Sequence, residues 1–460
     1  MAPRITVVGG GSTHWTPRLL TDFAQTPSLR GATVVLHDID APSLDPMVTV
    51  GRHIARSLDI GLEVTGTTDL AAALDGAEFV ISAFSVGGFE SMAHDLEIPA
   101  RFGLRQPVGD SVGPGGIFRS LRSIPVLLAI ARAIEERAPD ALLLNVSNPM
   151  TALCRAVCSE TAVRTVGLCN ELVGLQFWLS LVFDVPMHLV DPTVAGVNHL
   201  PLVTALKLGD DDGFARLREV LEHPAQLEGQ PVWMDPPAQS HWHKLDPAGD
   251  WTKADIMANN ALKLEVFRRF GVLPGSADTH VAEFFPWFVT AASDWGRDWG
   301  VHHYGLAGHR LDKADDDAEA AALVEGGPVS PWPSGELAAP LLDAIVTDQP
   351  RALPMNLPNT SQVPDLPADV VVECMGLASG TGVVARDVAS PGAAGEHLRR
   401  VVASQELTVR AALAGDPALV LRAMLADPVA GSLPFEHVVE MTDRLLTATA
   451  PWLPQFAAGA

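Results

Sequence analysis

Short apolar runs alternate with amphipathic segments along the first part of the chain. The apolar runs are typical of buried strands and cover residues 5–9, 32–37, 78–83, 141–146 and 165–168. The segments between them place apolar residues at helical spacing and include residues 16–25, 69–75 and 119–136. Strands that alternate with helices across short polar turns are typical of a doubly wound parallel sheet. The pattern therefore predicts an α/β fold of the Rossmann type.

The pattern changes after residue 190. The later predicted strands cover residues 193–198, 202–208 and 369–374, and the later predicted helices cover residues 253–270, 312–325, 395–414 and 416–426. We predict two domains, a Rossmann domain over residues 1–195 and an α+β domain over residues 196–460 that binds substrate and forms oligomer contacts. The acidic helix 312–325 is expected to be solvated, and the Gly- and Pro-rich stretch 326–336 to be a surface connection.

Composition and charge narrow the class of protein. Hydrophobic residues make up 47% of the 460 residues, and the formal net charge is −24. The acidity argues against nucleic acid or an anionic membrane as a partner, because both require clustered Lys and Arg. No apolar run approaches the roughly 20 residues of a membrane span, and no secretory signal pattern is visible. We therefore expect a soluble, cytoplasmic protein, and its four cysteines are too few for a disulfide framework.

A glycine-rich turn, Gly9-Gly10-Gly11-Ser12, follows the first strand and opens a helix. Glycines there let the backbone approach a pyrophosphate, and the helix N-terminus offers free N–H groups to the phosphates. Asp38 ends the second strand, where a carboxylate accepts hydrogen bonds from ribose hydroxyls and favours NAD over NADP. The residues expected to bind NAD are Gly9, Gly11, Ser12, Thr13 and Asp38. His14 occupies the third glycine position of the usual pattern.

Cys169 and His199 each follow a strand-like run, which would bring them to one edge of the sheet. A thiolate and an imidazole are good ligands for a divalent transition metal, and two protein ligands leave positions open for sugar hydroxyls and water. Spacing alone favours the simpler interpretation, a buried cysteine and a core histidine.

Four further segments change this balance. They are Gly109-Asp110-Ser111-Val112-Gly113-Pro114-Gly115-Gly116-Ile117-Phe118-Arg119, Asn145-Val146-Ser147-Asn148-Pro149-Met150, Gly167-Leu168-Cys169-Asn170-Glu171 and Gly196-Val197-Asn198-His199. Together with the glycine turn, they resemble glycoside hydrolase family 4, whose members are NAD- and divalent-metal-dependent glycosidases. The order and spacing of five motifs carry this resemblance, which spans residues 5–385.

The resemblance implies NAD as a catalytic cofactor and Mn²⁺ held by Cys169 and His199. It also implies that an α-glycoside is hydrolysed by redox-assisted elimination. In that route NAD⁺ takes hydride from C3, a base removes the C2 proton, the aglycone leaves C1, water adds, and the hydride returns to C3.

The residues that match the family's motifs limit the candidates for the catalytic acid and base. Many family members use a tyrosine as base, but the one tyrosine here is Tyr304, and the segment Glu283-Phe284-Phe285-Pro286 lacks a phenol where one branch has it. We favour Asp278 as the base, with Tyr304 and His280 as alternatives. Asp110 is the candidate acid, because Asn170, which follows the metal cysteine, cannot donate a proton as an acid.

Substrate contacts are expected from Asn148, Asn170, Arg119 and His280. Structural alternatives stand beside several of these roles. Asp278 could cap a helix, Asp110 could stabilise a turn, and Arg119 could bind loop carbonyls.

The expected sugar is unphosphorylated, because Arg105–Ser111 departs from the signature of the phosphosugar branch. Cys169-Asn170-Glu171 also departs from the Cys-His-Glu segment of the other branches, which suggests an outlying group. Aromatic and basic residues gather in the middle region, at Trp233, His241, Trp242, His243, Lys244, Trp251, Arg297, Trp299, His302, His303, His309 and Arg310. Because Trp faces suit sugar rings and Arg or His can hold an anionic C6 group, we prefer a hexuronide or a sulfoquinovoside over a neutral α-glucoside or α-galactoside.

Two other functions share the glycine turn. An NAD-dependent dehydrogenase of a sugar or a 2-hydroxy acid, similar to lactate and malate dehydrogenases, would consume NAD stoichiometrically without a metal. A non-catalytic NAD sensor would bind nucleotide regardless of metal. The resemblance to the glycosidases further implies a homodimer or homotetramer.

Overall fold

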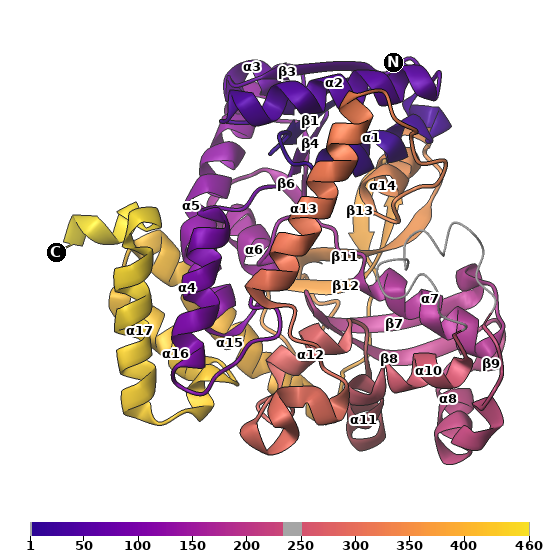
Figure 1. Ribbon diagram of the computed structural model, residues 1–460, viewed down its shortest axis with the longest axis vertical. Helices are drawn as coiled ribbons and strands as arrows, with labels where there is room; N and C mark the ends of the chain where they lie inside the picture. The colour runs from indigo at the N-terminus through magenta and orange to yellow at the C-terminus, as the bar shows by residue number, and fades with distance from the viewer. Residues whose placement is uncertain (1, 233–250, 460) are drawn as a thin grey trace.

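The computed structural model describes residues 2–232 and 251–459 of the chain. Five residues of the aromatic and basic group, Trp233, His241, Trp242, His243 and Lys244, lie outside the described residues. One long mixed sheet runs through the molecule, with helices on both of its faces (Figure 1).

The parallel half of the sheet has the strand order β3-β2-β1-β4-β5-β6, which is the Rossmann order. Its strands are β1 (Arg4–Val8), β2 (Thr33–His37), β3 (Glu63–Thr67), β4 (Phe79–Ser82), β5 (Leu142–Asn145) and β6 (Arg164–Gly167). The predicted doubly wound fold is therefore confirmed.

The second half of the sheet is antiparallel. Its strands are β7 (Val190–Val197), β8 (Leu200–Leu208), β9 (Asp211–Asp212), β10 (Leu273–Pro274), β11 (Arg351–Pro358), β12 (Val371–Ser379) and β13 (Gly382–Ala385). A single bridge between Asn356 of β11 and Gly167 of β6 joins the halves, and another between Glu373 and Gly196 joins β12 to β7 within the antiparallel half. The sheet is thus continuous across the predicted domain boundary at residue 195, which falls inside β7.

Successive side chains of the central strands point to opposite faces, and each face is covered by its own helices. Ile5 and Val7 join a core with α1 (Trp15–Ala24), α2 (Ala41–Ser57) and α14 (Ala338–Thr347). Val8 joins a core on the other face. That face is covered by α5 (Gly113–Arg137), α6 (Met150–Glu160), α15 (Ala393–Ala414), α16 (Pro417–Ala426) and α17 (Phe435–Thr449), and the C-terminal three form the yellow layer beside α5 in Figure 1.

The remaining helices pack at several places around the sheet. They are α3 (Leu70–Leu74), α4 (Gly88–Ala100), α7 (Glu171–Phe183), α8 (Gly213–Glu222), α10 (Lys253–Ala258), α11 (Ala261–Phe270), α12 (Asp278–Phe284) and α13 (Gly305–Val324). The predicted helix 253–270 is thus broken into α10 and α11, and the predicted helix 312–325 begins earlier. Helix α13 contacts both α2 and α4 and crosses the front of the molecule in Figure 1.

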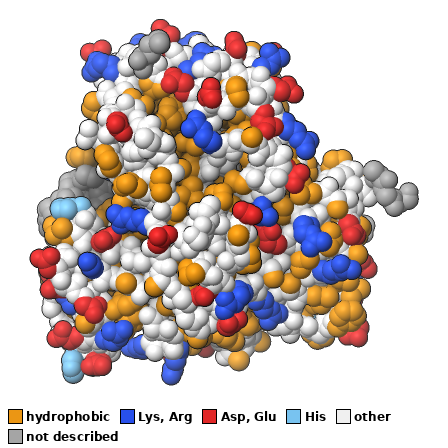
Figure 2. Space-filling view, turned by 180° about the vertical axis from the view of Figure 1, so that it is seen from behind, with side chains coloured by type: hydrophobic (Ala, Val, Ile, Leu, Met, Phe, Trp, Pro, Cys, Tyr) orange, Lys and Arg blue, Asp and Glu red, His pale blue; other side chains and the backbone are white. Residues whose placement is uncertain are grey.

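Acidic and basic side chains are interspersed over the face of the molecule drawn in Figure 2. Within residues 2–232 and 251–459, no helix has the length and apolar character needed to cross a membrane.

Candidate active site

The glycine turn connects β1 to α1 in a conformation that requires glycine. Gly9 has φ +96°, and a Cβ on it would lie 2.1 Å from the carbonyl oxygen of Ala83. The amides of Gly9 and Gly10 both donate to the carbonyl oxygen of His37, which fixes the turn at the end of β2. Asp38 follows and accepts a hydrogen bond from the Gly11 amide (2.9 Å). The expected turn and its carboxylate therefore lie together.

Two of the residues beyond the turn contact α13. The Thr13 hydroxyl donates to Asp317 Oδ1 (2.8 Å), and His14 Nδ1 lies 2.7 Å from Asp316 Oδ2. Ser12 Oγ instead accepts a hydrogen bond from the Trp15 amide at the start of α1 (3.1 Å). The Thr13 side chain is therefore turned towards α13.

His199 lies in the tight turn between β7 and β8, and it has φ +66°. A left-handed conformation is uncommon for a residue with a side chain, and such positions concentrate at functional sites. His199 Nδ1 lies 2.8 Å from Ser111 Oγ and 3.4 Å from Asp110 Oδ1, and its ring is also a hydrogen-bond partner of Cys169. The two residues predicted as metal ligands are therefore brought together.

Asp110 and His280 complete the group around His199. Their candidate ligand atoms and that of His199 all lie within 4.8 Å of one another. The rings of His199 and His280 have centroids 3.9 Å apart, and His280 Nδ1 lies 4.0 Å from Asp110 Oδ1. His280 Nδ1 is buried and has no hydrogen-bond partner among the described residues. The sequence singled out these three residues, but not their proximity.

Burial and charge act against each other in this group. Burial alone would raise the pKa of Asp110, but His199 and His280 hold it well below the usual range. Burial would lower the pKa of His199, but Asp110 and Cys169 raise it well above the usual value. Burial raises the pKa of the Cys169 thiol despite the opposing effect of His199. The group is a coupled set of donors and acceptors.

Asn148 and Arg119 extend this group towards β5. Asn148 Nδ2 donates to Asp110 Oδ2 (3.0 Å), and its buried Oδ1 is unpaired within the described part of the chain. Arg119 donates through Nε to the Asn148 carbonyl oxygen (3.2 Å), as in the structural alternative weighed for it. Asn148 therefore presents one free polar atom to the site.

Asp278 is engaged with α11. Its carboxylate accepts hydrogen bonds from the amides of Leu262 (2.8 Å) and Lys263 (3.2 Å), and Lys263 Nζ lies 3.9 Å from it. These are the first residues of α11, so Asp278 caps that helix from a distance. In this arrangement the predicted base has both carboxylate oxygens occupied.

Tyr304 and His309 reach the site from the start of α13. The Tyr304 amide donates to the Pro107 carbonyl oxygen (3.0 Å), and its ring packs edge-on against His309 with centroids 4.6 Å apart. Burial lowers the pKa of His309, whereas the Asp110 carboxylate acts to raise it. This interaction with Asp110 indicates that the His309 ring lies near the site.

Asn170 contacts a residue that is distant in sequence. Its Nδ2 donates to Glu336 Oε1 (3.0 Å). Both residues line a cavity of about 570 Å³ together with Cys169 and His199. The cavity walls also include Trp15 of α1 and Trp332 of the connection 326–336. Asn170 thus lies on the same cavity as Cys169, the predicted metal ligand.

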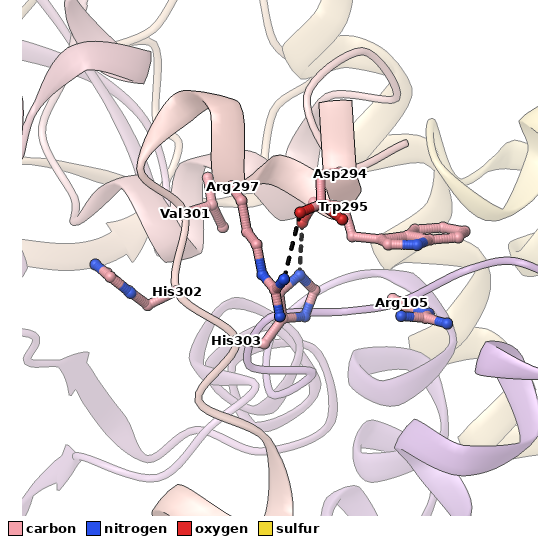
Figure 3. Close-up of a pocket in the computed structure, with 7 residues that line it drawn as sticks. All are labelled: Arg105, Asp294, Trp295, Arg297, Val301, His302 and His303. Carbon is pink, nitrogen blue, oxygen red and sulfur yellow. Dashed lines mark hydrogen bonds and ion pairs between the residues drawn. The ribbon is translucent and has the colours of Figure 1, made fainter. Parts of the chain in front are cut away.

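A second cavity, also of about 570 Å³, is lined by Arg105, Asp294, Trp295, Arg297, Val301, His302 and His303 (Figure 3). The Arg105 guanidinium lies 4.4 Å from the centre of the Trp295 ring, and Arg297 pairs with Asp294 at 3.3 Å. Asp294 and Trp295 both have positive φ. Two guanidinium groups, one of them paired with Asp294, and two imidazoles line this cavity.

Two site residues, Glu283 and Glu336, have no role assigned from the sequence pattern. Glu283 Oε1 accepts hydrogen bonds from the amides of Val108 (2.6 Å) and Gly109 (2.7 Å), immediately before Asp110. Glu336 comes from the end of the connection 326–336, which the sequence predicts only as a surface connection. The only available signal was that Glu283 belongs to a segment resembling the family, because burial and long-range contacts leave no local pattern.

These features define an enzyme built on a dinucleotide-binding fold. The family 4 glycosyl hydrolase model matches residues 4–184, and the model of the C-terminal domain of that family matches residues 194–430. The chain therefore belongs to glycosyl hydrolase family 4, and it is a glycosidase.

Relatives in this family act on several sugars. An α-galactosidase of Rhizobium meliloti is 29% identical over 99% of this chain and 90% of its own length. An α-galacturonidase of Thermoanaerobacterium saccharolyticum is 30% identical over 92% of this chain and 91% of its own length.

Solved structures agree on the fold. The lplD protein of Bacillus subtilis has a TM-score of 0.84 at 26% identity and covers 96% of this chain and 99% of its own. A 6-phospho-α-glucosidase from gut microorganisms, solved with NAD and Mn²⁺, has a TM-score of 0.81 at 19% identity, with 99% and 100% coverage. A lactate dehydrogenase of Cryptosporidium parvum has a TM-score of 0.51 at 12% identity, with 90% and 98% coverage, which confirms the predicted likeness of the fold to that class.

Proposed function

We propose that this protein is an NAD- and Mn²⁺-dependent α-glycosidase that hydrolyses an unphosphorylated sugar by redox-assisted elimination. The single observation that carries the proposal is the cluster of Cys169, His199, Asp110 and His280 at the strand ends beside the glycine turn. Family membership supports it, because family 4 glycosidases depend on NAD.

The glycine turn fits a dinucleotide. A Cβ on Gly11 would lie 2.9 Å from Asp38 Oδ2, so only glycine leaves the backbone open there. The first turn of α1 would then offer its amides to the pyrophosphate, and Asp38 would accept from the ribose. The cavity beside Asn148 and Trp15 would receive the nicotinamide half.

The donor set fits a divalent transition metal. Cys169 and His199 would be the protein ligands, a thiolate and an imidazole, and Asp110 is a further donor within reach. The unpaired Oδ1 of Asn198 is a buried polar atom that a bound ion, with its water and sugar ligands, would satisfy.

When bound, NAD⁺ supplies reversible hydride transfer and the divalent ion polarises two sugar oxygens. The chain's own residues orient the sugar and move protons. Asn148 would hold a hydroxyl through its free Oδ1, and His280 Nδ1 is the unpaired acceptor that we assign to the C2 proton in place of Asp278. Asp278 then positions α11 behind it.

We propose a substrate with an anionic C6 group, a hexuronide above all. Relatives named α-galacturonidase support this choice. The basic cavity of Arg105, Arg297, His302 and His303 lies next to the segment that carries Asp110, since Pro107 binds the Tyr304 amide. A carboxylate of the bound glycoside that reaches this cavity would be held by charge-assisted hydrogen bonds.

A panel of nitrophenyl α-glycosides tests the proposal. Galacturonide, glucuronide, sulfoquinovoside, galactoside and glucoside would each be incubated with NAD⁺ and Mn²⁺ under reducing conditions. We expect hydrolysis of an acidic sugar, loss of activity with EDTA or in Cys169→Ala, and washout of deuterium from C2. Stoichiometric reduction of NAD⁺ without hydrolysis would instead identify a dehydrogenase.

A further inference from the structure

The proposed glycosidase still needs a group that protonates the departing aglycone. Resting on that function, we propose that Glu336 is this general acid and that Asn170 positions it.

The geometry of the cleft supports this role. Glu336 lines the same cavity as Cys169 and His199, so its carboxyl group faces the space in which the sugar would lie beside the metal ligands. Asn170 Nδ2 donates to Glu336 Oε1 (3.0 Å), which leaves Oε2 free to carry a proton. The carboxyl therefore stands next to the residue that follows the metal cysteine.

The backbone of Glu336 is also fixed. Its amide donates to Ser334 Oγ (3.2 Å), and Ser334 in turn binds the Asp22 carboxylate through its amide (2.7 Å). The connection 326–336 is thereby anchored to α1 on one side and, through Asn170, to the start of α7 on the other. A fixed carboxyl group is what proton transfer to one oxygen atom requires.

The protonation state of Glu336 differs from that of the other carboxyl groups near the site. Burial, with the Asp22 and Glu171 carboxylates, raises the pKa of Glu336 to about 7, against the opposing effect of Arg18. The pKa values of Asp110 and Glu171 are instead lowered, by His199 and by His280 respectively, in each case against burial. Glu336 can therefore hold a proton near neutral pH.

The proton balance of the step is complete. As the C1–O bond breaks, its electron pair remains on the aglycone oxygen, which takes the proton from Glu336. The electron pair of the C2–H bond, whose proton goes to the base, forms the C1–C2 double bond. When water later adds at C1, the Glu336 carboxylate takes a proton from it, so the acid is restored for the next turnover.

Glu336→Gln tests the role through its dependence on the leaving group. The sugar identified in the panel would be supplied as its nitrophenyl and its methyl α-glycoside. Nitrophenolate leaves without protonation, whereas an alkoxide does not. We expect the turnover of the methyl glycoside to fall by about 10²- to 10⁴-fold and that of the nitrophenyl glycoside by less than about tenfold.

Controls separate this role from a structural one. Glu325→Gln makes the same substitution at an exposed site at the end of α13 and should change neither rate. Thermal unfolding and NAD⁺ binding of Glu336→Gln should match the wild type. If that variant does not fold, Asn170→Ala should show the same selectivity for the nitrophenyl substrate to a smaller extent.

Two results would overturn the assignment. Equal losses on both substrates would give Glu336 a structural role only, and undiminished hydrolysis of the methyl glycoside would remove it from the reaction. A wild-type enzyme that hydrolyses neither substrate with NAD⁺ and Mn²⁺ would overturn the proposed function itself.

Discussion

His14 Nδ1 lies 2.7 Å from Asp316 Oδ2, so the residue at the third glycine position of the nucleotide turn is bonded to α13. Arg18 Nη2 reaches the other carboxylate oxygen of Asp316 at 3.1 Å, and Thr13 binds the neighbouring Asp317. Asp316 is buried, with 5% of its side chain exposed. The departure from the glycine pattern therefore has a structural reason: the side chain ties the turn to the helix that lies across the cleft.

This contact predicts that Asp316 controls how long NAD⁺ stays bound. In Asp316→Asn the buried carboxylate between His14 and Arg18 is lost, so α13 should separate from α1 more easily. We expect the dissociation rate of NAD⁺, followed by fluorescence of the reduced cofactor in competition, to rise by about tenfold, equivalent to about 1.4 kcal/mol. Asp315→Asn, an exposed change on the same helix, is the matched control. Identical rates in the two variants would contradict the prediction.

Glu283 supports the segment that carries Asp110. Because its Oε1 accepts from the Val108 and Gly109 amides, Glu283→Gln should keep both hydrogen bonds and most of the activity. Glu283→Ala leaves two buried amides unpaired, at a cost of about 1–3 kcal/mol each, and releases Asp110. We expect kcat/KM of the alanine variant to fall by about 100-fold. The idea fails if both variants lose activity equally in steady-state assays.

The central parallel strands could be predicted because most of their residues are apolar, as strands buried on both faces require. Edge strand β3 escaped the prediction, since Val64 is its one buried residue. Cys169 and His199 could be expected at one sheet edge because both follow strands. The partners of Asn170 and His14 could not be predicted. Asn170 is separated from Glu336 by 166 residues, and His14 from Asp316 by 302. Such contacts arise from packing of the late connection against the early sheet.

Arg122 and Asp95 form a buried ion pair that joins α5 to α4. Two hydrogen bonds of 3.1 and 2.5 Å link them, and each side chain is 1% exposed. Asp95→Ala would leave a buried guanidinium unpaired, so we expect a loss of about 3–5 kcal/mol in unfolding free energy, measured by urea denaturation. Glu440→Ala breaks the exposed pair with Arg444 and should cost less than about 1 kcal/mol. If the two variants lost similar amounts of unfolding free energy, burial would not be what makes the Arg122–Asp95 pair costly to break.

Asp22 predicts a pH-dependent stability that can be isolated by one substitution. Burial raises its pKa from 3.8 to about 6, although hydrogen bonds from Ser334 act the other way. Between these two pH values the folded protein binds more protons at Asp22 than the unfolded chain does. The contribution of this group to stability therefore falls by about 3 kcal/mol in total as the pH rises through this window. Above the window the contribution is constant.

Asp22→Asn keeps an oxygen that accepts from the Ser334 amide and removes the titration. We expect the variant, relative to wild type, to gain stability steadily from pH 4 to pH 6 and to hold a constant advantage above that range. Urea denaturation at a series of pH values measures the difference. Asp45→Asn, at an exposed position of α2, should give a flat difference curve. A flat curve for Asp22→Asn as well would contradict the prediction. It would mean that the wild-type Asp22 carboxyl has the same pKa in the folded protein and in the unfolded chain, because only a difference in pKa makes stability depend on pH.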